Sequence, residues 1–397
     1  MKNVNMLLSD NQAWISETFK KIDRKFQAVT LRSRDKLPYG IDENGFHRDM
    51  FESNRRSWWT NGFWGGMNWL LYNETKNEEY RKTAKRSEEL LEKVAQEYTP
   101  LHHDVGFMWH LTTGADYRLT GDQQAKNRNL YMAASLASRF VMATDVPGGF
   151  IRAWNGKWQE SSNYDWSIVD CLMNIPLLYW ASEEIGDDRF KRVAMAHADM
   201  ALRDHLRPDG SVNHIVEHDR ATGALVKTYG GQGIAEGSSW SRGCAWALYG
   251  FALSYLHTKE ERYLNGAKSV ANYFIANCCD DWLPRVDFRA PAEPVLYDST
   301  AGACAACGLI EIAKAVPENE GGMYMNAAIN LLRAMGEHFC NWDPEKDDFL
   351  DFGTERYPAN LSEEGLKKAG VHIPIIYGDF FYVEAILKLL GNEFNPW

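Results

Sequence analysis

A weak internal repeat constrains the fold of this chain more than any other feature of its sequence. Five segments carry an aromatic residue or leucine followed four residues later by alanine, and each opens a charged, amphipathic helical pattern. The pairs are Tyr80/Ala84, Leu130/Ala134, Phe190/Ala194, Tyr263/Ala267 and Tyr324/Ala328. Their starts lie 50, 60, 73 and 61 residues apart, and residues 11–26 have a similar pattern. Spacings of this size indicate an array of similar helical units.

Apolar helical segments rich in glycine and alanine alternate with these amphipathic ones. We predict them at 61–73, 104–119, 167–183, 240–257, 298–315 and 377–390. Small residues let helices approach closely, and hydrophobicity around most of a helix indicates burial. The alternation therefore predicts an all-α fold, an (α/α)6 barrel with six inner and six outer helices. No linker rich in proline or serine divides the chain, so we expect residues 1–397 to form a single barrel domain.

Composition narrows the partners and the compartment. A net charge of -11 argues against nucleic acid or an anionic membrane as the main target. There is no run of about 18 apolar residues and no signal-peptide pattern at the N-terminus. The seven cysteines are an odd number, and Cys304 and Cys307 lie in an apolar helical run that favours packing over zinc. A cytoplasmic protein is the expectation, and no feature indicates an oligomeric state.

Polar and aromatic residues gather at the starts of the predicted inner helices. Parallel inner helices would bring all of them to one rim, as a concave ligand site requires. N-capping alone would explain Asp298 and Asp379, but it does not explain tryptophan and arginine at the same level. Burial in the core is an alternative for many of the 15 tryptophans. The rim residues are Trp58, Trp59, Thr60, Asn61, His103, Asp104, Asp165, Trp166, Asp170, Trp240, Ser241, Arg242, Asp298, Ser299, Tyr377, Gly378 and Asp379.

Two of these rim residues are candidates for acid–base chemistry. Asp170 is flanked by Val169, Cys171 and Leu172, and burial in apolar surroundings raises the pKa of a carboxyl group, which suits a general acid. A cap or a salt bridge to Arg242 is the structural alternative. Asp104 begins another inner helix, where it could cap the helix, serve as the second carboxylate of a glycoside-type reaction, or do both.

Other residues suit binding rather than proton transfer. Arg242 carries a guanidinium fork that can grip a carboxylate, and Trp246 lies on the same helix face. His214 follows a turn, where a neutral imidazole can donate to a sugar, whereas we expect His197 and His205 to lie on the surface of an outer helix. The "HHD" at 102–104 lacks a partner motif for a metal, so no metal or other cofactor is predicted.

The chain resembles the unsaturated glucuronyl hydrolases, family 88 of the glycoside hydrolases. Seven stretches in one order carry the resemblance. They are "WWTNGFWGGMNWLLY", "HHDVGFMW", "VDCLMNIPLLYWA", "PDGSVNH", "GQGIAEGSSWSRGCAWALYG", "YDSTAGACAACGLIE" and "YGDFFYVEAIL".

The resemblance implies the (α/α)6 barrel and removal of an unsaturated uronic acid from the non-reducing end of oligosaccharides that lyases release from glycosaminoglycans. It implies that Asp170 is the catalytic acid/base, which protonates C4 of the C4=C5 bond while water adds at C5, and that Asp104 is the second essential carboxylate. Substrate-site positions would be His214, Gln232, Trp240, Arg242 and Trp246. We add Trp58, Trp59, His103 and Tyr377 from the rim. No cofactor or metal is implied.

Three other functions fit parts of the pattern. The related unsaturated rhamnogalacturonyl hydrolases act on pectin fragments, although "SWSRG" and "HDVGF" favour the glucuronyl family. An inverting glycosidase would need a water-holding base and saturated substrates. A sugar-binding scaffold would not need a buried Asp170. The polar loop at 352–372 contains Lys367 and Lys368, which either contact a sulfate at the cleft edge or are simply solvated.

Overall fold

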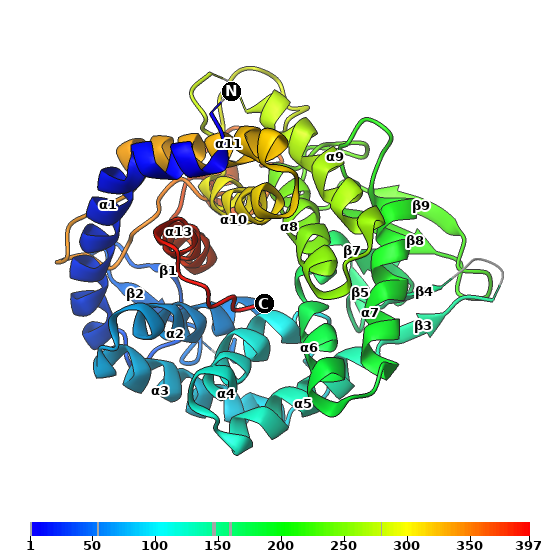
Figure 1. Ribbon diagram of the computed structural model, residues 1–397. Helices are drawn as coiled ribbons and strands as arrows, with labels where there is room; N and C mark the ends of the chain where they lie inside the picture. Colours follow the sequence, from blue (N-terminus) through cyan, green and yellow to red (C-terminus); the bar gives the residue numbers. More distant parts are fainter. Residues whose placement is uncertain (1, 54, 145–147, 159–160, 279) are drawn as a thin grey trace.

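Two concentric rings of helices form the molecule, as the view along the barrel in Figure 1 shows. The computed structural model describes residues 2–53, 55–144, 148–158, 161–278 and 280–397. Within these residues, six outer helical positions alternate with six inner ones along the chain. The predicted (α/α)6 barrel is confirmed.

The outer helices are amphipathic and bury one face against the inner ring. Tyr80 and Ala84 of α3 are both buried, as are the corresponding pairs at Tyr263 and Tyr324. In these three helices the pair marks the buried face, since residues four apart share a face. The pair Leu130/Ala134 does not follow the pattern, because Leu130 is half-buried and Ala134 is exposed, and in the pair Phe190/Ala194 only the alanine is fully buried. The outer helices are α1 (Val4–Arg32), α3 (Glu78–Ala95), α5 (Gln123–Ala137), α7 (Arg189–Met200) with the π-helical turn η4 (Ala201–His205), α9 (Glu261–Asn277) and α11 (Glu318–His338).

The inner helices are buried almost all round, as their apolar sequences predicted. The first, α2 (Phe63–Thr75), follows the short 3-10 helix η1 (Trp59–Gly62). The second is π-helical over η2 (Gly106–Gly114) before it continues as α4 (Ala115–Thr120). The others are η3 (Val169–Met173) with α6 (Pro176–Ile185), α8 (Ser241–Thr258), α10 (Ser299–Ala315) and α13 (Ile376–Leu390).

Short antiparallel strands, which the helical pattern did not predict, connect the helices. They are β1 (Pro38–Ile41), β2 (His47–Asp49), β3 (Phe140–Met142), β4 (Gly149–Ile151), β5 (Lys157–Trp158), β6 (Ser161–Ser162), β7 (Trp166–Ile168), β8 (Ile215–His218) and β9 (Leu225–Tyr229). The three-stranded sheet has the order β7–β8–β9. Because β7 leads into η3 and β8 follows His214, this sheet holds Asp170 and His214 in adjacent segments, with Val169 N donating to His214 O at 3.1 Å.

These strands also correct one prediction. His197 and His205 were expected at the surface, but both are fully buried. His197 Nδ1 accepts from Ile151 N of β4 at 3.1 Å, and His205 bonds Ser167 Oγ of β7 at 2.8 Å. Strands thus cover the parts of α7 and η4 that carry these two histidines, which helical periodicity alone cannot reveal.

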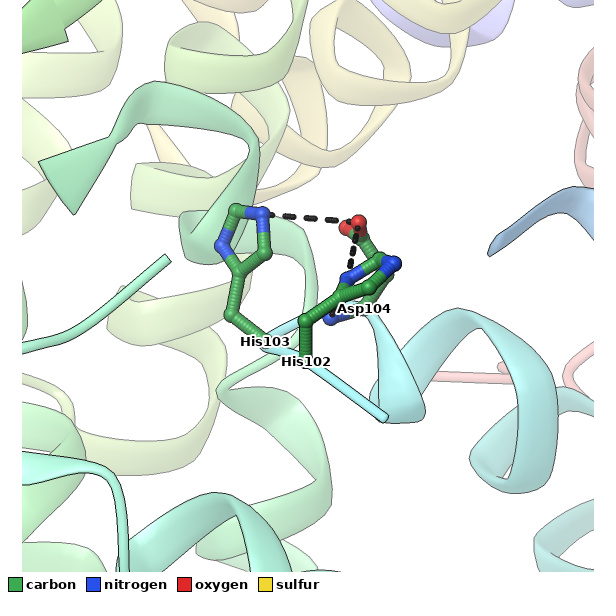
Figure 2. Close-up of side chains that lie close together, drawn as sticks. All are labelled: His102, His103 and Asp104. Carbon is green, nitrogen blue, oxygen red and sulfur yellow. Dashed lines mark hydrogen bonds and ion pairs between the residues drawn. The ribbon is translucent and has the colours of Figure 1, made fainter. Parts of the chain in front are cut away.

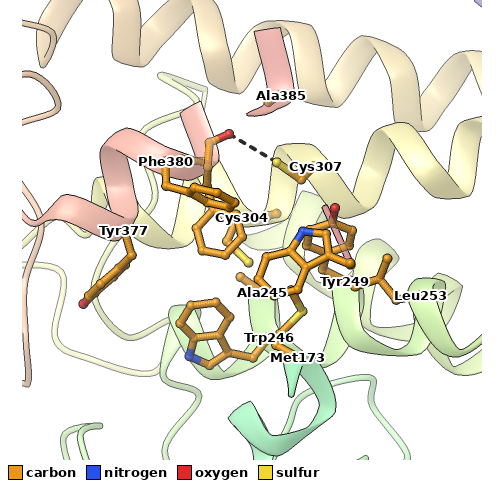
Figure 3. Packing of buried hydrophobic residues seen from close by; sticks show 14 of the residues in the cluster. Met173, Ala245, Trp246, Tyr249, Leu253, Cys304, Cys307, Tyr377, Phe380 and Ala385 are labelled. Carbon is orange, nitrogen blue, oxygen red and sulfur yellow. Dashed lines mark hydrogen bonds between the residues drawn. The ribbon is translucent and has the colours of Figure 1, made fainter. Parts of the chain in front are cut away.

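The core is tightly packed on the side of the barrel away from the rim. Figure 3 shows Cys304, Cys307 and Trp246 among the packed side chains, and Cys307 Sγ lies 3.2 Å from Phe381 O. The prediction that these two cysteines pack in a helix is confirmed. The last residues fold back inside the ring, where Trp397 stacks on Phe381. Among the described helices, none is long and apolar enough to cross a membrane.

Candidate active site

A cavity of about 520 Å³ lies at the rim where the inner helices begin. Both candidate carboxylates, Asp104 and Asp170, line it. Its other walls come from η1, from the starts of α8 and α13, and from the loops and strands between helices. The lining residues are Tyr39, Arg55, Trp58, Trp59, His102, Asp104, Trp154, Asp170, His214, Ile215, Gly231, Gln232, Arg242, Glu355, Arg356, Lys368 and Tyr377. The sequence argument for one rim thus leads to one cavity.

Asp104 is held by three neighbours and does not cap its own helix. Figure 2 shows the two preceding histidine rings turned toward its carboxylate. His102 Nδ1 lies 3.0 Å and His103 Nε2 lies 3.4 Å from Oδ2. The other oxygen, Oδ1, accepts from Asn174 Nδ2 at 3.1 Å. The expected capping role is filled from another segment, because the Phe107 N–H donates to Asn174 Oδ1 at 2.8 Å.

The environments of the two carboxyl groups push their pKa values apart. Burial raises the pKa of Asp104, but His103, His102 and the hydrogen bond from Asn174 outweigh it, so the pKa is lowered. Burial raises the pKa of Asp170 well above the usual aspartate range, and the negative charge of Asp104 raises it further. One carboxylate is therefore held ionised beside one that retains its proton, which is the arrangement that separates an acid from a charged partner.

Asp170 is not engaged in the salt bridge that was its structural alternative. Its Oδ1 is buried and accepts no hydrogen bond from the described residues. Arg242 instead donates to Asp298, with the side chains of both 1% exposed or less. An unpaired carboxyl oxygen facing a cavity is available to a ligand.

The fork of Arg242 holds several protein acceptors and also lines the cavity, so its grip on a substrate carboxylate stays a prediction. Nη1 donates to Asp298, to Thr300 Oγ1 at 3.1 Å and to Thr354 O at 2.7 Å. Nη2 donates to Glu355 O at 2.8 Å. The guanidinium also lies against the rings of Trp240 and Tyr377. Arg242 thus contributes positive charge to the cavity wall while it anchors the loop that follows residue 353.

His214 and Gln232 form a second polar pair on the wall. The backbone N–H of Gln232 donates to His214 Nδ1 at 3.0 Å, so the neutral ring carries its proton on Nε2. Burial lowers the pKa of His214 to about 3, which keeps the ring neutral at physiological pH. A Cβ on Gly231, whose φ is +60°, would lie 2.1 Å from His214 Nδ1. The glycine therefore permits the loop to approach the histidine.

The predicted aromatic residues divide into a wall and a supporting layer. Trp58, Trp59 and Tyr377 line the cavity, and the rings of Trp59 and Tyr377 are 5.1 Å apart. Trp240 and Trp246 are almost fully buried and are not among the lining residues. The ring centroids of Trp240 and His214 are 4.3 Å apart, and those of Trp246 and Phe107 are 5.4 Å apart. These two were predicted to contact substrate, but they lie behind the wall.

His103 was also predicted at the substrate and lies behind the wall. It is fully buried, and burial lowers its pKa to about 4. Its neighbour His102 lines the cavity instead. His102, for which no substrate role was predicted, thus lies at the cavity, while His103 supports Asp104 from inside the protein.

The sequence missed the lining residues that come from loops and hairpins. Nine lining residues were absent from the predicted substrate site: Tyr39, Arg55, His102, Trp154, Ile215, Gly231, Glu355, Arg356 and Lys368. Two of them had drawn a functional interpretation from the sequence, His102 in "HHD" and Lys368 as one of two lysines in the polar loop. Tyr39 OH donates to Glu355 Oε1, a contact across more than 300 residues of sequence. No local pattern could reveal such a pairing.

The three residues at 102–104 bring metal-ligand atoms close together. One donor atom from each lies within 4.8 Å of the others. However, the two histidine nitrogens already lie 3.0 and 3.4 Å from Asp104 Oδ2, and Asp104 also accepts from Asn174. The absence of a metal requirement therefore stays a prediction.

A barrel whose rim cavity holds one protonated and one ionised carboxyl group beside aromatic rings defines a carbohydrate-active enzyme site. The sequence model of Glycosyl Hydrolase Family 88 matches residues 38–283. The chain belongs to this family.

Characterised relatives cover nearly the whole chain. It is 34% identical over 368 residues to the unsaturated glucuronyl hydrolase of Bacillus sp. (strain GL1), covering 91% of this chain and 93% of that one. It is 33% identical over 344 residues to the unsaturated chondroitin disaccharide hydrolase of Streptococcus pneumoniae, covering 85% of this chain and 83% of that one. A crystal structure of the Bacillus sp. GL1 enzyme superposes with a TM-score of 0.85 at 32% identity, covering 94% of this chain and 96% of that one.

Proposed function

We propose that this enzyme removes 4,5-unsaturated uronic acid from the non-reducing end of oligosaccharides that lyases release from glycosaminoglycans of the chondroitin or hyaluronan type. The observation that carries the proposal is the pair of unlike carboxyl groups in one cavity, Asp170 with a raised pKa and Asp104 with a lowered one. Relatives described as unsaturated glucuronyl or chondroitin disaccharide hydrolases support the substrate class.

The lining residues suit a small anionic sugar. Arg55, Arg356 and Lys368 bring positive charge to the cavity, although the chain as a whole carries -11. The rings of Trp58 and Trp59 offer faces on which a sugar can stack. A related structure from Streptococcus agalactiae, 26% identical with a TM-score of 0.78, is described as complexed with dGlcA-GalNAc6S.

The chemistry begins with proton transfer to carbon. The carboxyl group of Asp170 gives its proton to C4, and the electron pair of the C4=C5 bond forms the new C4–H bond. Positive charge develops at C5 and the ring oxygen, where the ionised carboxylate of Asp104 stabilises it. Water then adds its oxygen to C5 and returns a proton to Asp170, which regenerates the acid.

The hydrated sugar leaves without further catalysis by carboxyl groups. The hemiketal at C5 opens by breaking the bond from C5 to the ring oxygen, which leaves a ketone at C5 and a hemiacetal at C1. The hemiacetal forms an aldehyde and expels the alcohol of the next sugar. One water is consumed, and no oxidant, reductant or metal is needed for the balance.

Ultraviolet absorbance tests this proposal directly, because the double bond conjugated to the carboxylate absorbs and its hydration removes the signal. We expect the wild-type enzyme to bleach unsaturated chondroitin disaccharides and Asp170→Asn to leave them unchanged. Saturated disaccharides and unsaturated rhamnogalacturonyl fragments serve as competing substrates. Turnover of either in preference to the chondroitin substrate would overturn the assignment.

Asp379 provides a matched control for Asp170. It also lies in the first turn of an inner helix, and burial raises its pKa well above the usual range, but it does not line the cavity. Its Oδ1 accepts from Leu350 N at 2.9 Å, a bond that asparagine can keep. Asp379→Asn should therefore retain activity. Equal loss in both variants would mean that buried carboxylates at helix starts act only through stability.

A further inference from the structure

Asn174 lies between the two candidate catalytic carboxyl groups and contacts both of their segments. Its Nδ2 donates to Asp104 Oδ1 at 3.1 Å and to the Asp170 carbonyl oxygen at 3.2 Å. Its Oδ1 accepts from Phe107 N at 2.8 Å. The side chain is fully buried. Both N–H groups and the carbonyl oxygen of this one amide are thus used within the site.

The orientation of this amide is fixed by its partners. The Phe107 N–H can only donate, so it requires the oxygen of the amide, and the NH2 group must then face Asp104. Packing fixes its position as well. A Cβ on Gly106 would lie 2.6 Å from Asn174 O and 2.7 Å from its Cα and Oδ1. Glycine at 106 lets the start of η2 rest directly on Asn174.

Asn174 differs from the histidines around Asp104 in its response to pH. An imidazole such as that of His103 can lose or gain a proton, whereas an amide donates the same hydrogen bond at every pH. Hydrogen bonding to the charged form of a carboxyl group lowers its pKa. The ionised state of Asp104 also raises the pKa of Asp170. The amide of Asn174 therefore acts on both carboxyl groups, directly on one and through charge on the other.

We propose that Asn174 is a positioning residue that keeps Asp104 ionised, caps the helix that Asp104 precedes, and holds the backbone of Asp170 in register with it. It does not line the cavity, so it acts through the two aspartates and not on the sugar. The proposal rests on the proposed function for the catalytic meaning of these effects, but the contacts themselves do not depend on it.

The pH dependence of kcat/KM on an unsaturated chondroitin disaccharide distinguishes positioning from general stability. A lost hydrogen bond to a buried ion changes its ionisation equilibrium roughly ten- to a hundredfold. Asn174→Ala should therefore move the acid limb of the profile up by about one to two pH units. In Asn174→Asp, two carboxyl groups would compete for one proton, and the shift should be larger.

Asn129 of α5 supplies the matched control, because it packs on the end of η2 whereas Asn174 packs on its start. It is also fully buried, its Nδ2 lies 3.2 Å from His110 Nδ1, and it packs on Gly114 as Asn174 packs on Gly106. Asn129→Ala should lower thermal stability without moving the acid limb. An unmoved acid limb in Asn174→Ala, or an equal movement in Asn129→Ala, would overturn the positioning role.

Two further measurements keep the test independent of activity and of folding. Carboxyl 13C resonances of labelled aspartate, with Asp104 assigned from Asp104→Asn, should show a raised Asp104 pKa in Asn174→Ala. In the Asp104→Asn background, Asn174→Asp exchanges donor and acceptor, so its melting temperature should fall less than in the wild-type background. An unchanged Asp104 pKa, or equal falls in both backgrounds, would refute the proposal. A shifted pKa in a protein inactive on the disaccharide would retain the positioning role and reject the proposed function.

Discussion

The buried ion pair between Arg242 and Asp298 gives the sharpest stability prediction. Arg242 Nη1 donates to Asp298 Oδ2, and the two side chains are 1% and 0% exposed. In Asp298→Asn the oxygen that accepts from Thr300 N and Thr354 N can remain. The change thus removes the charge and presents an amide N–H to a guanidinium that can only donate. Breaking such a pair from one side leaves a buried, unpaired cation and should destabilise the fold by about 3–5 kcal/mol.

An exposed pair of the same chemistry serves as the control. Arg220 donates to both oxygens of Asp165 at 2.7 and 3.0 Å, but its side chain is 57% exposed. Asp165→Asn should therefore change stability by only about 0.2–1 kcal/mol. Urea unfolding at neutral pH, followed by tryptophan fluorescence, measures both variants. A difference of less than about 1 kcal/mol between them would refute the argument that Arg242 is fixed by burial with Asp298.

Four further predictions concern the cavity. The pKa of Asp104 is lowered and that of Asp170 is raised well above the usual range, so kcat/KM should follow a bell with its acid limb from Asp104 and its alkaline limb from Asp170. A raised folded-state pKa means that stability falls as pH rises above the ordinary aspartate pKa, so Asp170→Asn should melt higher than wild type at pH 7 and lose this advantage in acid. Lys368→Ala should raise KM for 6-sulfated unsaturated disaccharides about two- to fivefold more than for unsulfated ones. Lys367 lies outside the cavity lining, so Lys367→Ala should not show this difference between substrates. Equal effects of the two substitutions would mean that both lysines belong to a solvated loop. Dialysis against EDTA should leave kcat unchanged, and a loss that zinc restores would assign a metal to the cluster at 102–104.

The barrel and the two carboxylates were accessible from sequence because both depend on local patterns. The apolar pattern of a helix predicts that the helix is buried, and the same pattern shows where the helix begins. A polar residue in the first turn is therefore assigned to the start of a buried helix. Asp104 and Asp170 each lie within two residues of an inner helical start, so six parallel starts place them on one rim. The only global assumption was that the six inner helices run in the same direction.

The failures arose wherever a contact joins distant segments. Asn174 reaches Asp104 across 70 residues and replaces the cap that the local sequence assigned to Asp104 itself. Arg242 reaches Asp298 across 56 residues, an ion pair that the local sequence did not predict. His197 is covered by a strand that lies 46 residues earlier. Hydrophobic periodicity describes one helix at a time and does not predict such partners. The path of the connecting segments decides which distant residue comes into contact with the helix.

The charges and helix ends at the rim affect the pKa values of Asp104 and Asp170 together. The starts of α8 and α13 lie at the cavity, and the positive ends of these helices favour a bound uronate. The same field opposes a retained proton on Asp170, since it stabilises the ionised form of any carboxyl group there. Burial and the negative charge of Asp104 act in the other direction and raise the pKa of Asp170. Burial, and after it the negative charge of Asp104, therefore keep Asp170 protonated at a rim that favours anions, and we expect the hydrogen bonds that hold Asp104 to affect proton transfer from Asp170.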